Sequence, residues 1–198
     1  MSHPYRDHYF HKAKKENYLA RAVYKLEEIQ KKYRILKTGD RVLDLGAAPG
    51  SWMQFSSSVV GPSGLVVGVD LKPIVHPFPE QVIAVQGDVF DGDFQEKLVN
   101  DYGCFDVILS DMAPATSGIR SADSARSELL FEEALRVTRV ALKTHGHFLA
   151  KIFQGPDFHT LLTRVKGQFS RVKVVKPDAS RKFSKEIYIL AMDFKQRL

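Results

Sequence analysis

Asp44-Leu45-Gly46-Ala47-Ala48-Pro49-Gly50-Ser51-Trp52 is the stretch of this 198-residue chain that says most about its fold. The apolar run over residues 41–46 predicts a buried strand, and residues 51–60 have the pattern of a short helix. A turn of small residues between a strand and a helix lets backbone amides come close to a ligand, and the helix contributes its positive end. We therefore expect a ligand-binding turn here.

The same alternation of strand and helix patterns continues to the end of the chain. Short apolar runs between helices are typical of a parallel sheet covered by helices on both faces. Because no helix separates the last two strands, we expect them to pair antiparallel at one edge of the sheet. The predicted strands cover residues 65–70, 82–86, 105–110, 147–153, 171–175 and 186–192, and the predicted helices cover 95–100, 124–142 and 157–166.

The chain has no internal repeat and no linker long enough to divide it, so we expect one domain over residues 1–198. Residues 1–16 are polar and aromatic without helical periodicity, which predicts a basic, aromatic N-terminal arm. Apolar residues at helical spacing predict a basic helix within residues 17–37, with Asn17 as its candidate N-cap, and residues 38–198 form the core.

Composition indicates the compartment. No apolar run approaches the ~18 residues that span a bilayer, and the N-terminus lacks the apolar region of a secretory signal. The single cysteine, Cys104, excludes an intrachain disulfide and a multi-cysteine zinc site. His3, His8 and His11 have a spacing that fits no tight metal site. We expect a cytoplasmic protein with no membrane contact and no metal.

The net charge of +6 is distributed unevenly along the chain. Residues 1–37 carry a net charge of +6 and residues 164–185 a net charge of +7, whereas residues 38–163 carry −7. Basic clusters of this size favour a polyphosphate partner such as RNA or DNA, although each could also be an ordinary solvated face. Aromatic side chains in the arm could stack on bases or pack the arm against the domain. These are Tyr5, Tyr9, Phe10 and Tyr18.

Acidic residues close the two strands that follow the turn. A carboxylate at Asp70 can accept hydrogen bonds from both ribose hydroxyls of a nucleoside, and one at Asp88 can accept from an adenine amino group. The turn is not the Gly-x-Gly-x-x-Gly of nicotinamide sites and holds no P-loop lysine. S-adenosylmethionine, whose two cationic groups suit an acidic pocket, is therefore the expected cofactor. The alternative is that the glycines serve only the turn and the aspartates only cap strand ends. The expected binding residues from this motif are Gly46, Ala47, Pro49, Gly50, Trp52, Asp70 and Asp88.

Two charged residues stand where burial makes a charge costly. Lys151 interrupts the apolar run 148–153 near its carboxyl end, and Asp111 directly follows the run 105–110. In a parallel sheet both side chains should point into the crevice where ligands bind. A charge there needs a partner or a chemical task, although Lys151 could also reach solvent from the strand end.

With these motifs in this order, the chain closely resembles the FtsJ (RrmJ) family of S-adenosylmethionine-dependent RNA ribose 2′-O-methyltransferases. The resemblance covers nearly the whole chain from about Tyr5. It implies an α/β, Rossmann-like methyltransferase fold: a mostly parallel seven-stranded sheet with helices on both faces and one antiparallel edge strand. The matching segments are 21–26 (Arg-Ala-Val-Tyr-Lys-Leu), 45–52, 109–114 (Leu-Ser-Asp-Met-Ala-Pro), 151–155 (Lys-Ile-Phe-Gln-Gly), 176–181 (Lys-Pro-Asp-Ala-Ser-Arg) and 186–188 (Glu-Ile-Tyr).

The resemblance also implies a catalytic tetrad, which falls on Lys25, Asp111, Lys151 and Glu186. Taken alone, Lys25 and Glu186 would pass for surface residues, so their expected role depends on the resemblance. The cofactor contacts that the resemblance implies are Gly50, Trp52, Asp70, Asp88 and Asp111.

The chemistry of such a reaction assigns Lys151 one of two roles. A ribose 2′-hydroxyl attacks the methyl carbon in line while the sulfur leaves neutral, so alignment should supply much of the acceleration. Lys151 can act as the general base only if it is partly neutral, a form that burial and the charge of Lys25 favour. Asp111 and Glu186 favour the ammonium, which would instead orient the hydroxyl and stabilise negative charge on its oxygen. Both roles stay open.

By resemblance, the expected substrate is a uridine of large-subunit ribosomal RNA in the assembled subunit, bound by a monomer. Transfer RNA is the enzymatic alternative. A non-catalytic RNA-binding assembly factor with the same fold is the other, and the filled tetrad argues against it. Two departures from the family pattern affect the turn and the substrate entrance: Ser51 stands where Gly or Ala is frequent, and Ala115 where Asn is frequent.

Overall fold

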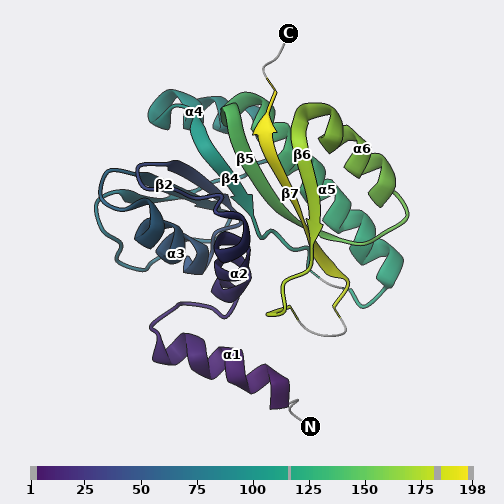
Figure 1. The fold of residues 1–198 in the computed structure, drawn as a ribbon, viewed down its shortest axis with the longest axis horizontal. Helices are drawn as coiled ribbons and strands as arrows, with labels where there is room; N and C mark the ends of the chain where they lie inside the picture. The colour runs from purple at the N-terminus through teal and green to yellow at the C-terminus, as the bar shows by residue number, and fades with distance from the viewer. Residues whose placement is uncertain (1–3, 116, 181–183, 196–198) are drawn as a thin grey trace.

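The structure, a computed structural model, describes residues 4–115, 117–180 and 184–195. Within these residues, seven strands form one sheet in the order β3-β2-β1-β4-β5-β7-β6 (Figure 1). Strands β1 to β5 are parallel, and β7 is antiparallel to both of its neighbours. The predicted α/β fold with a mostly parallel seven-stranded sheet is confirmed. The strands are β1 (Arg41–Leu45), β2 (Leu65–Asp70), β3 (Val82–Gln86), β4 (Phe105–Ser110), β5 (Leu142–Phe153), β6 (Phe169–Val175) and β7 (Glu186–Phe194).

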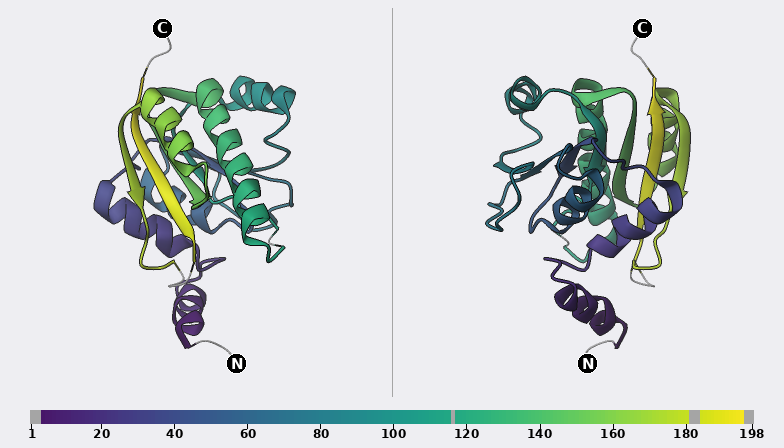
Figure 2. Two further views of the ribbon diagram at one scale, coloured as in Figure 1. Left: turned by 90° about the vertical axis from the view of Figure 1, so that its right-hand side faces the viewer. Right: turned by 60° about the vertical axis from the view of Figure 1, so that its left-hand side comes forward.

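Helices cover both faces of this sheet (Figure 2). On one face, α4 (Gly92–Tyr102), α5 (Arg120–Ala141) and α6 (Phe158–Gln168) pack their apolar residues against alternate side chains of the strands. On the other face, α2 (Val23–Tyr33) and α3 (Ser51–Val60) bury a second apolar cluster. Because successive strand residues point to opposite faces, the same strands contribute to both cores.

The last two strands pair antiparallel at one edge of the sheet, which confirms that prediction, but β7, the strand antiparallel to the parallel set, lies one position inside the edge. β7 pairs with β5 on one side and with β6 on the other, so β6 is the edge strand. The reason is burial: residues 187–192 of β7 are all buried, whereas most residues of β6 are exposed or half-buried. A continuously apolar strand needs neighbours on both sides, and a half-polar strand can face solvent at an edge.

The N-terminal segment differs from the predicted arm, because residues Pro4–Lys15 form a helix, α1, that extends away from the sheet (Figure 1). Among its described side chains only Ala13 is buried, which explains why no helical periodicity was visible. The next helix, α2, begins at Val23 rather than near Asn17, whose φ of 59° is left-handed. Asn17 is therefore not an N-cap.

The aromatic residues near α1 pack the segment onto the domain. The ring of Tyr24 lies 5.3 Å from that of Tyr9 and 6.2 Å from that of Tyr18, and the ammonium of Lys12 lies 4.2 Å from the Tyr24 ring centroid. Phe10 is 57% exposed and stays available to a partner. The side chain of Tyr5 lies outside the described residues, as does Arg181 of the 176–181 segment.

A side-chain cap starts α4, whereas α2, α3, α5 and α6 begin without one. α4 begins where the Asp91 carboxylate accepts from the amides of Asp93 and Phe94, and it ends at Gly103. α5 and β5 each begin a few residues earlier than predicted. Among the helices that the structure describes, none is long and apolar enough to cross a membrane.

Candidate active site

The carboxyl ends of the parallel strands bring the candidate residues to one edge of the sheet. Asp70 ends β2, Asp111 directly follows β4, and Lys151 lies near the end of β5. Because β7 runs antiparallel, its first residue, Glu186, pairs with Phe153 at the same edge. Segments far apart in the chain therefore meet where parallel sheets of this kind bind ligands.

The turn between β1 and α3 requires two glycines. Gly46 has a φ of 74°, and a Cβ on it would lie 2.5 Å from Met112 Cγ. Gly50 has a φ of 110°, and a Cβ on it would lie 2.7 Å from Phe78 Cζ. The left-handed backbone and the lack of space both disfavour a side chain at these two positions. The amides of Gly46 and Gly50 donate within the protein, to the backbone oxygens of Val69 and Ala47, and so hold the shape of the turn.

Asp70 and Asp88 both accept hydrogen bonds from the backbone. The two carboxylate oxygens of Asp70 accept from the amides of Ala48 and Lys72, each at 2.9 Å. Asp88, which is exposed beyond β3, accepts from the amide of Phe90 at 2.9 Å. A carboxylate has about four acceptor positions, so these bonds leave capacity for ligand hydroxyl or amino groups.

The other residues of the turn differ in exposure. Ala47 and Trp52 are buried, whereas Pro49, which follows a cis peptide bond, is exposed. The indole Nε1 of Trp52 donates to the backbone oxygen of Ala22 at 2.9 Å. Trp52 thus links α3 to the residue before α2, the helix that carries Lys25. The only N–H of the indole side chain is used in that contact.

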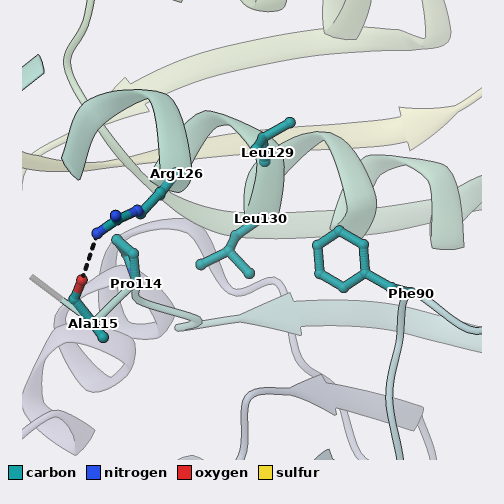
Figure 3. Close-up of a pocket in the computed structure, with 6 residues that line it drawn as sticks. All are labelled: Phe90, Pro114, Ala115, Arg126, Leu129 and Leu130. Carbon is teal, nitrogen blue, oxygen red and sulfur yellow. Dashed lines mark hydrogen bonds between the residues drawn. The ribbon is translucent and has the colours of Figure 1, made fainter. Parts of the chain in front are cut away.

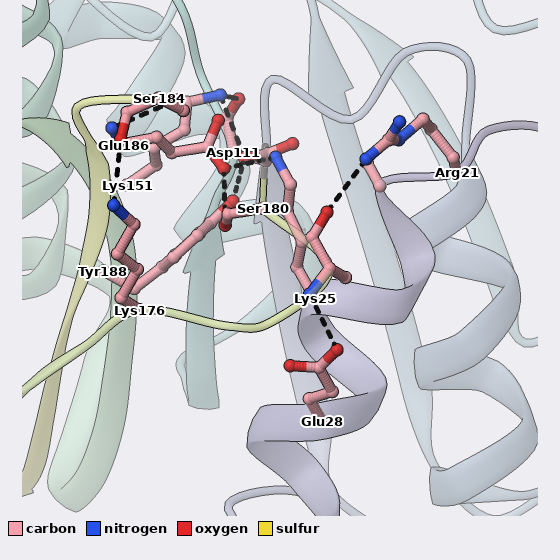
Figure 4. A network of polar contacts seen from close by, with 12 residues as sticks. Arg21, Lys25, Glu28, Asp111, Lys151, Lys176, Ser180, Ser184, Glu186 and Tyr188 are labelled. Carbon is pink, nitrogen blue, oxygen red and sulfur yellow. Dashed lines mark hydrogen bonds and ion pairs between the residues drawn. The ribbon is translucent and has the colours of Figure 1, made fainter. Parts of the chain in front are cut away.

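Two lysine–carboxylate pairs form the centre of the site (Figure 4). Lys151 Nζ lies 2.9 Å from Asp111 Oδ1 and also donates to the backbone oxygen of Asp111. Lys25 Nζ lies 2.6 Å from Glu186 Oε1. The side chains of Lys151 and Lys25 are only 5% and 12% exposed, so each ammonium depends on its carboxylate. The four residues of the expected tetrad are therefore brought together.

Tyr188 connects the two pairs. Its hydroxyl donates to Asp111 Oδ1 at 2.6 Å, and Lys25 Nζ lies 5.8 Å from the centroid of its ring. In the β5–β7 ladder it stands opposite Lys151. Sequence reasoning did not select Tyr188 as a site residue, because a tyrosine in an apolar strand has the pattern of a core residue. Only the strand register brings it into the site.

The surrounding charges decide the protonation state of Asp111. Burial raises the pKa of its carboxyl, but Lys151, Lys25 and the hydrogen bond from Tyr188 outweigh burial and hold the pKa below its ordinary value. Burial, together with the charges of Asp111 and Glu186, raises the pKa of Tyr188 well above its usual range. Asp111 is thus a carboxylate at neutral pH, and the phenol of Tyr188 is its donor.

Comparison with known proteins identifies the group of enzymes to which this site belongs. The family model of the FtsJ-like methyltransferases matches residues 18–194, which include every strand and all helices from α2 onward. The chain belongs to this family. The protein is therefore an enzyme of methyl transfer, and its fold is that of the Rossmann-like methyltransferases.

Individual FtsJ-like relatives and neighbours agree with this assignment. Ribosomal RNA large subunit methyltransferase E of Syntrophobacter fumaroxidans is 68% identical, over 97% of this chain and 98% of its own. A crystal structure from Plasmodium falciparum, described as a ribosomal RNA methyltransferase, has a TM-score of 0.81 at 29% identity and covers 91% of this chain and 100% of its own. Fibrillarin from Aeropyrum pernix, solved with bound S-adenosyl-L-methionine, covers 88% of this chain and 75% of its own, with a TM-score of 0.59; at 19% identity it shows the shared fold.

One buried carboxyl of this FtsJ-like protein has no partner. Asp44 in β1 is 1% exposed, and neither of its carboxylate oxygens has a hydrogen-bond partner among the described residues. Burial raises the pKa of Asp44 well above its ordinary value, and the charges of Asp111 and Asp70 add to this effect. An orphaned carboxyl between two aspartates fits a ligand that carries a cationic group. Asp44 was missed, although an acidic residue inside an apolar strand is the same signal that marked Lys151.

A cavity of about 340 Å³ lies against one side of α5 (Figure 3). The residues that line it come from the segments after β3 and β4 and from α5. They are Phe90, Pro114, Ala115, Arg126, Leu129 and Leu130. Arg126 Nη1 donates to the backbone oxygen of Ala115 at 3.3 Å, which ties α5 to the segment that follows Asp111. In this FtsJ-like enzyme none of the four tetrad residues lines the cavity.

Proposed function

We propose that the protein transfers a methyl group from S-adenosylmethionine to a ribose 2′-hydroxyl of large-subunit ribosomal RNA, on a uridine in the assembled subunit. The observation that carries this proposal is the pairing of Lys151 with Asp111 beside the pairing of Lys25 with Glu186, next to the turn at Gly46. Relatives of up to 68% identity that are named as large-subunit ribosomal RNA methyltransferases support the choice of RNA.

The residues of the turn and the neighbouring strand ends suit this cofactor. Beside the turn at Gly46 and Gly50, the remaining acceptor positions of Asp70 would hold a ribose and those of Asp88 an adenine amino group. The orphaned Asp44 would face a cationic group at the methionine end. When bound, S-adenosylmethionine supplies a methyl group on a positively charged sulfur, which is already activated for transfer.

Lys151 acts in this proposal as an ammonium that orients the acceptor hydroxyl. An ammonium has three N–H donors, and the side-chain and backbone oxygens of Asp111 take two of them. The third is left for the ribose 2′-oxygen, where it would stabilise the negative charge that develops during the in-line attack. As the oxygen–methyl bond forms and the methyl–sulfur bond breaks, the hydroxyl proton would leave to solvent water. The carboxylate of Asp111 lies 2.9 Å from Lys151 Nζ and offsets the charge of this buried ammonium.

The basic ends of the chain would bind RNA phosphates. Lys14 and Lys15 are exposed on α1, and Lys173 and Lys176 are exposed near the end of β6. Figure 1 shows α1 and the loop after β6 on the same side of the molecule, where the tetrad lies. We also propose that residues 1–198 act as one domain and as a monomer, because one chain supplies all four side chains of the two ion pairs. The single cysteine suits the reducing cytoplasm, where we place the protein.

The decisive experiment offers undermodified large ribosomal subunits and transfer RNA, separately, to the purified protein with S-adenosylmethionine labelled in its methyl group. Label should enter undermodified large ribosomal subunits, and mass spectrometry of nuclease digests should find it on a single 2′-O-methyluridine. Lys151→Ala should abolish incorporation while the protein still binds the cofactor. Incorporation into transfer RNA instead would overturn the ribosomal target. Absence of turnover with subunit binding intact would indicate a non-catalytic assembly factor.

A further inference from the structure

The loop between β6 and β7 is attached to α2 by hydrogen bonds that the methyl-transfer proposal does not use. The two carboxylate oxygens of Glu28 accept from the amides of Asp178 and Ala179, at 2.7 Å and 2.9 Å. From the turn before α2, Arg21 Nη2 donates to the backbone oxygen of Ala179 at 2.9 Å. Figure 4 shows Glu28 and Arg21 on this side of the network, with Lys25 between them.

The residue that follows these two amides contacts the tetrad. Ser180 is 5% exposed, and its hydroxyl donates to Glu186 Oε1 at 3.1 Å. Its own amide donates to the backbone oxygen of Pro177 at 3.0 Å, which closes a turn over residues 177–180. The amides that Glu28 holds are the central ones of this turn. The position of the Ser180 hydroxyl therefore depends on where Glu28 holds the turn.

The series of contacts that begins at Glu28 on α2 ends at Lys25 on the same helix. Glu186 Oε1, the oxygen that accepts from Ser180, also lies 2.6 Å from Lys25 Nζ. Lys25 and Glu28 are three residues apart on α2, so their side chains lie on one face of the helix. One turn of α2 thus carries two functional side chains. Lys25 forms the ion pair with Glu186, and Glu28 holds the loop whose Ser180 contacts Glu186.

We propose that Glu28 is a positioning residue: by holding the 177–180 turn it keeps Ser180 on Glu186 and so fixes the geometry of the Lys25–Glu186 pair. The proposal rests on the methyl-transfer function above, which gives that pair its role. Loss of the Glu28 carboxylate would leave two loop amides without their acceptor and let the turn move away from Glu186. The ion pair would then still form, but with its carboxylate held by one donor fewer.

The neighbouring Glu27 provides a matched control. It lies on the same helix with the same charge, and none of the described hydrogen bonds joins it to the loop. Glu28→Gln changes the charge by the same amount as Glu27→Gln. It also replaces one acceptor by an amide NH₂, which cannot accept from a backbone N–H. Any difference between the two variants therefore reports the loop contact rather than the charge.

The test measures kcat and KM for both substrates in Glu28→Gln, Glu27→Gln, Ser180→Ala and the double variant Glu28→Gln/Ser180→Ala. Glu28→Gln should lower kcat about tenfold, the size expected for one lost hydrogen bond to a charged group, with an unchanged KM for S-adenosylmethionine. Glu27→Gln should match the wild type. Ser180→Ala should resemble Glu28→Gln, and the double variant should be no slower than the slower single variant, because both changes break one chain of contacts.

Two outcomes would overturn the positioning role. The first is a double variant whose loss equals the product of the two single losses, since a merely structural contribution of Glu28 to the fold would be independent of Ser180. The second is a Glu28→Gln enzyme with wild-type kcat. If the wild-type protein itself turns over no RNA, the methyl-transfer proposal fails, and hydrogen exchange decides the inference. Faster exchange at residues 178–180 and 186 in Glu28→Gln than in Glu27→Gln supports it, and equal exchange refutes it.

Discussion

Tyr188 donates its phenolic hydrogen to Asp111 Oδ1 at 2.6 Å, the same oxygen that lies 2.9 Å from the ammonium of Lys151. One carboxylate oxygen is thus held between two donors that stand opposite each other in the β5–β7 ladder. Because burial and the charges of Asp111 and Glu186 raise the pKa of the Tyr188 phenol well above its usual range, the phenol keeps its hydrogen and donates it to Asp111. The alignment of Lys151 is in this way linked to a strand that also carries Glu186.

Tyr188→Phe tests this link. The substitution removes one hydrogen bond to a buried carboxylate and keeps the ring that packs 6.0 Å from Trp52. We expect kcat to fall about tenfold, because a hydrogen bond to a charged group contributes about 1.5 kcal/mol. The dissociation constant of S-adenosylmethionine, measured by calorimetry, should change little. A variant with unaltered kcat would show that Asp111 needs no second donor.

Lys151→Arg separates the two roles of Lys151. A guanidinium stays protonated at any accessible pH, so it cannot act as a general base, but it can donate hydrogen bonds and stabilise negative charge. If Lys151 orients the hydroxyl as an ammonium, Lys151→Arg should keep measurable turnover, roughly 10²-fold below the wild type and well above Lys151→Ala. The measurement is single-turnover methylation of large subunits. Arginine and alanine variants that are equally inactive would favour the general base.

Gly46→Ala tests the requirement for glycine in the turn. The left-handed φ of 74° costs an alanine roughly 1–2 kcal/mol, and the added Cβ meets Met112 Cγ at 2.5 Å, directly after Asp111. We expect a lower free energy of unfolding in denaturant titrations and weaker cofactor binding. Gly92→Ala is the control, since nothing lies within 4 Å of its Cβ at the start of α4. It should leave stability unchanged or raise it by about 0.5 kcal/mol.

The parts of the site that could be predicted from the sequence are those set by strand ends. Asp70, Asp111 and Lys151 were found because a parallel sheet presents its carboxyl ends at one edge, whatever the details of packing. Lys25 and Glu186 were named only through the family resemblance. Their meeting at 2.6 Å depends on how α2 docks and on β7 running antiparallel to β5, which are long-range features without a local pattern.

The sequence predictions that were wrong also have physical causes. α1 was missed because only Ala13 among its described side chains is buried, so it shows no apolar face. The edge position of the antiparallel strand was wrong because two adjacent strands joined by a loop can take either order. The continuous burial of residues 187–192 decides it, and that is visible only after β5 is in place. In the sequence, Tyr188 has the pattern of an apolar core residue. Its place in the site follows only from its pairing with Lys151 in the β5–β7 ladder.

Asp44 predicts a pH dependence of stability for the cofactor-free protein. Its pKa is raised in the folded state, so the folded protein binds this proton more tightly than the unfolded chain does. The resulting stability is fully present below the ordinary pKa of 3.8 and is lost as the pH rises through the raised value. Asp44→Asn should therefore gain in Tm relative to the wild type as pH rises. Added S-adenosylmethionine should stabilise the wild type more than the variant.

The control for this experiment is Glu96→Gln, which removes an exposed carboxylate from α4. Its Tm should follow the wild-type pH profile, because solvent surrounds this carboxylate in the folded protein as it does in the unfolded chain. Thermal unfolding by circular dichroism, recorded across a pH series with and without the cofactor, gives all the required values. Parallel profiles for Asp44→Asn and the wild type would show that folding does not raise the pKa of Asp44. This result would remove the basis for its role as a counter-charge to the cofactor.

The exposed lysines of α1 predict how RNA binding depends on salt. Each lysine that neutralises a phosphate adds about one unit to the slope of log K against log salt. Lys14→Ala/Lys15→Ala should therefore weaken binding of large subunits and lower the slope by about 2. The double variant Lys97→Ala/Lys195→Ala removes the same charge from α4 and the end of β7, which lie far from α1 in Figure 1. It should leave the slope unchanged. Equal slopes for both variants would mean that α1 does not bind RNA, and that the basic residues near β6 carry the attraction alone.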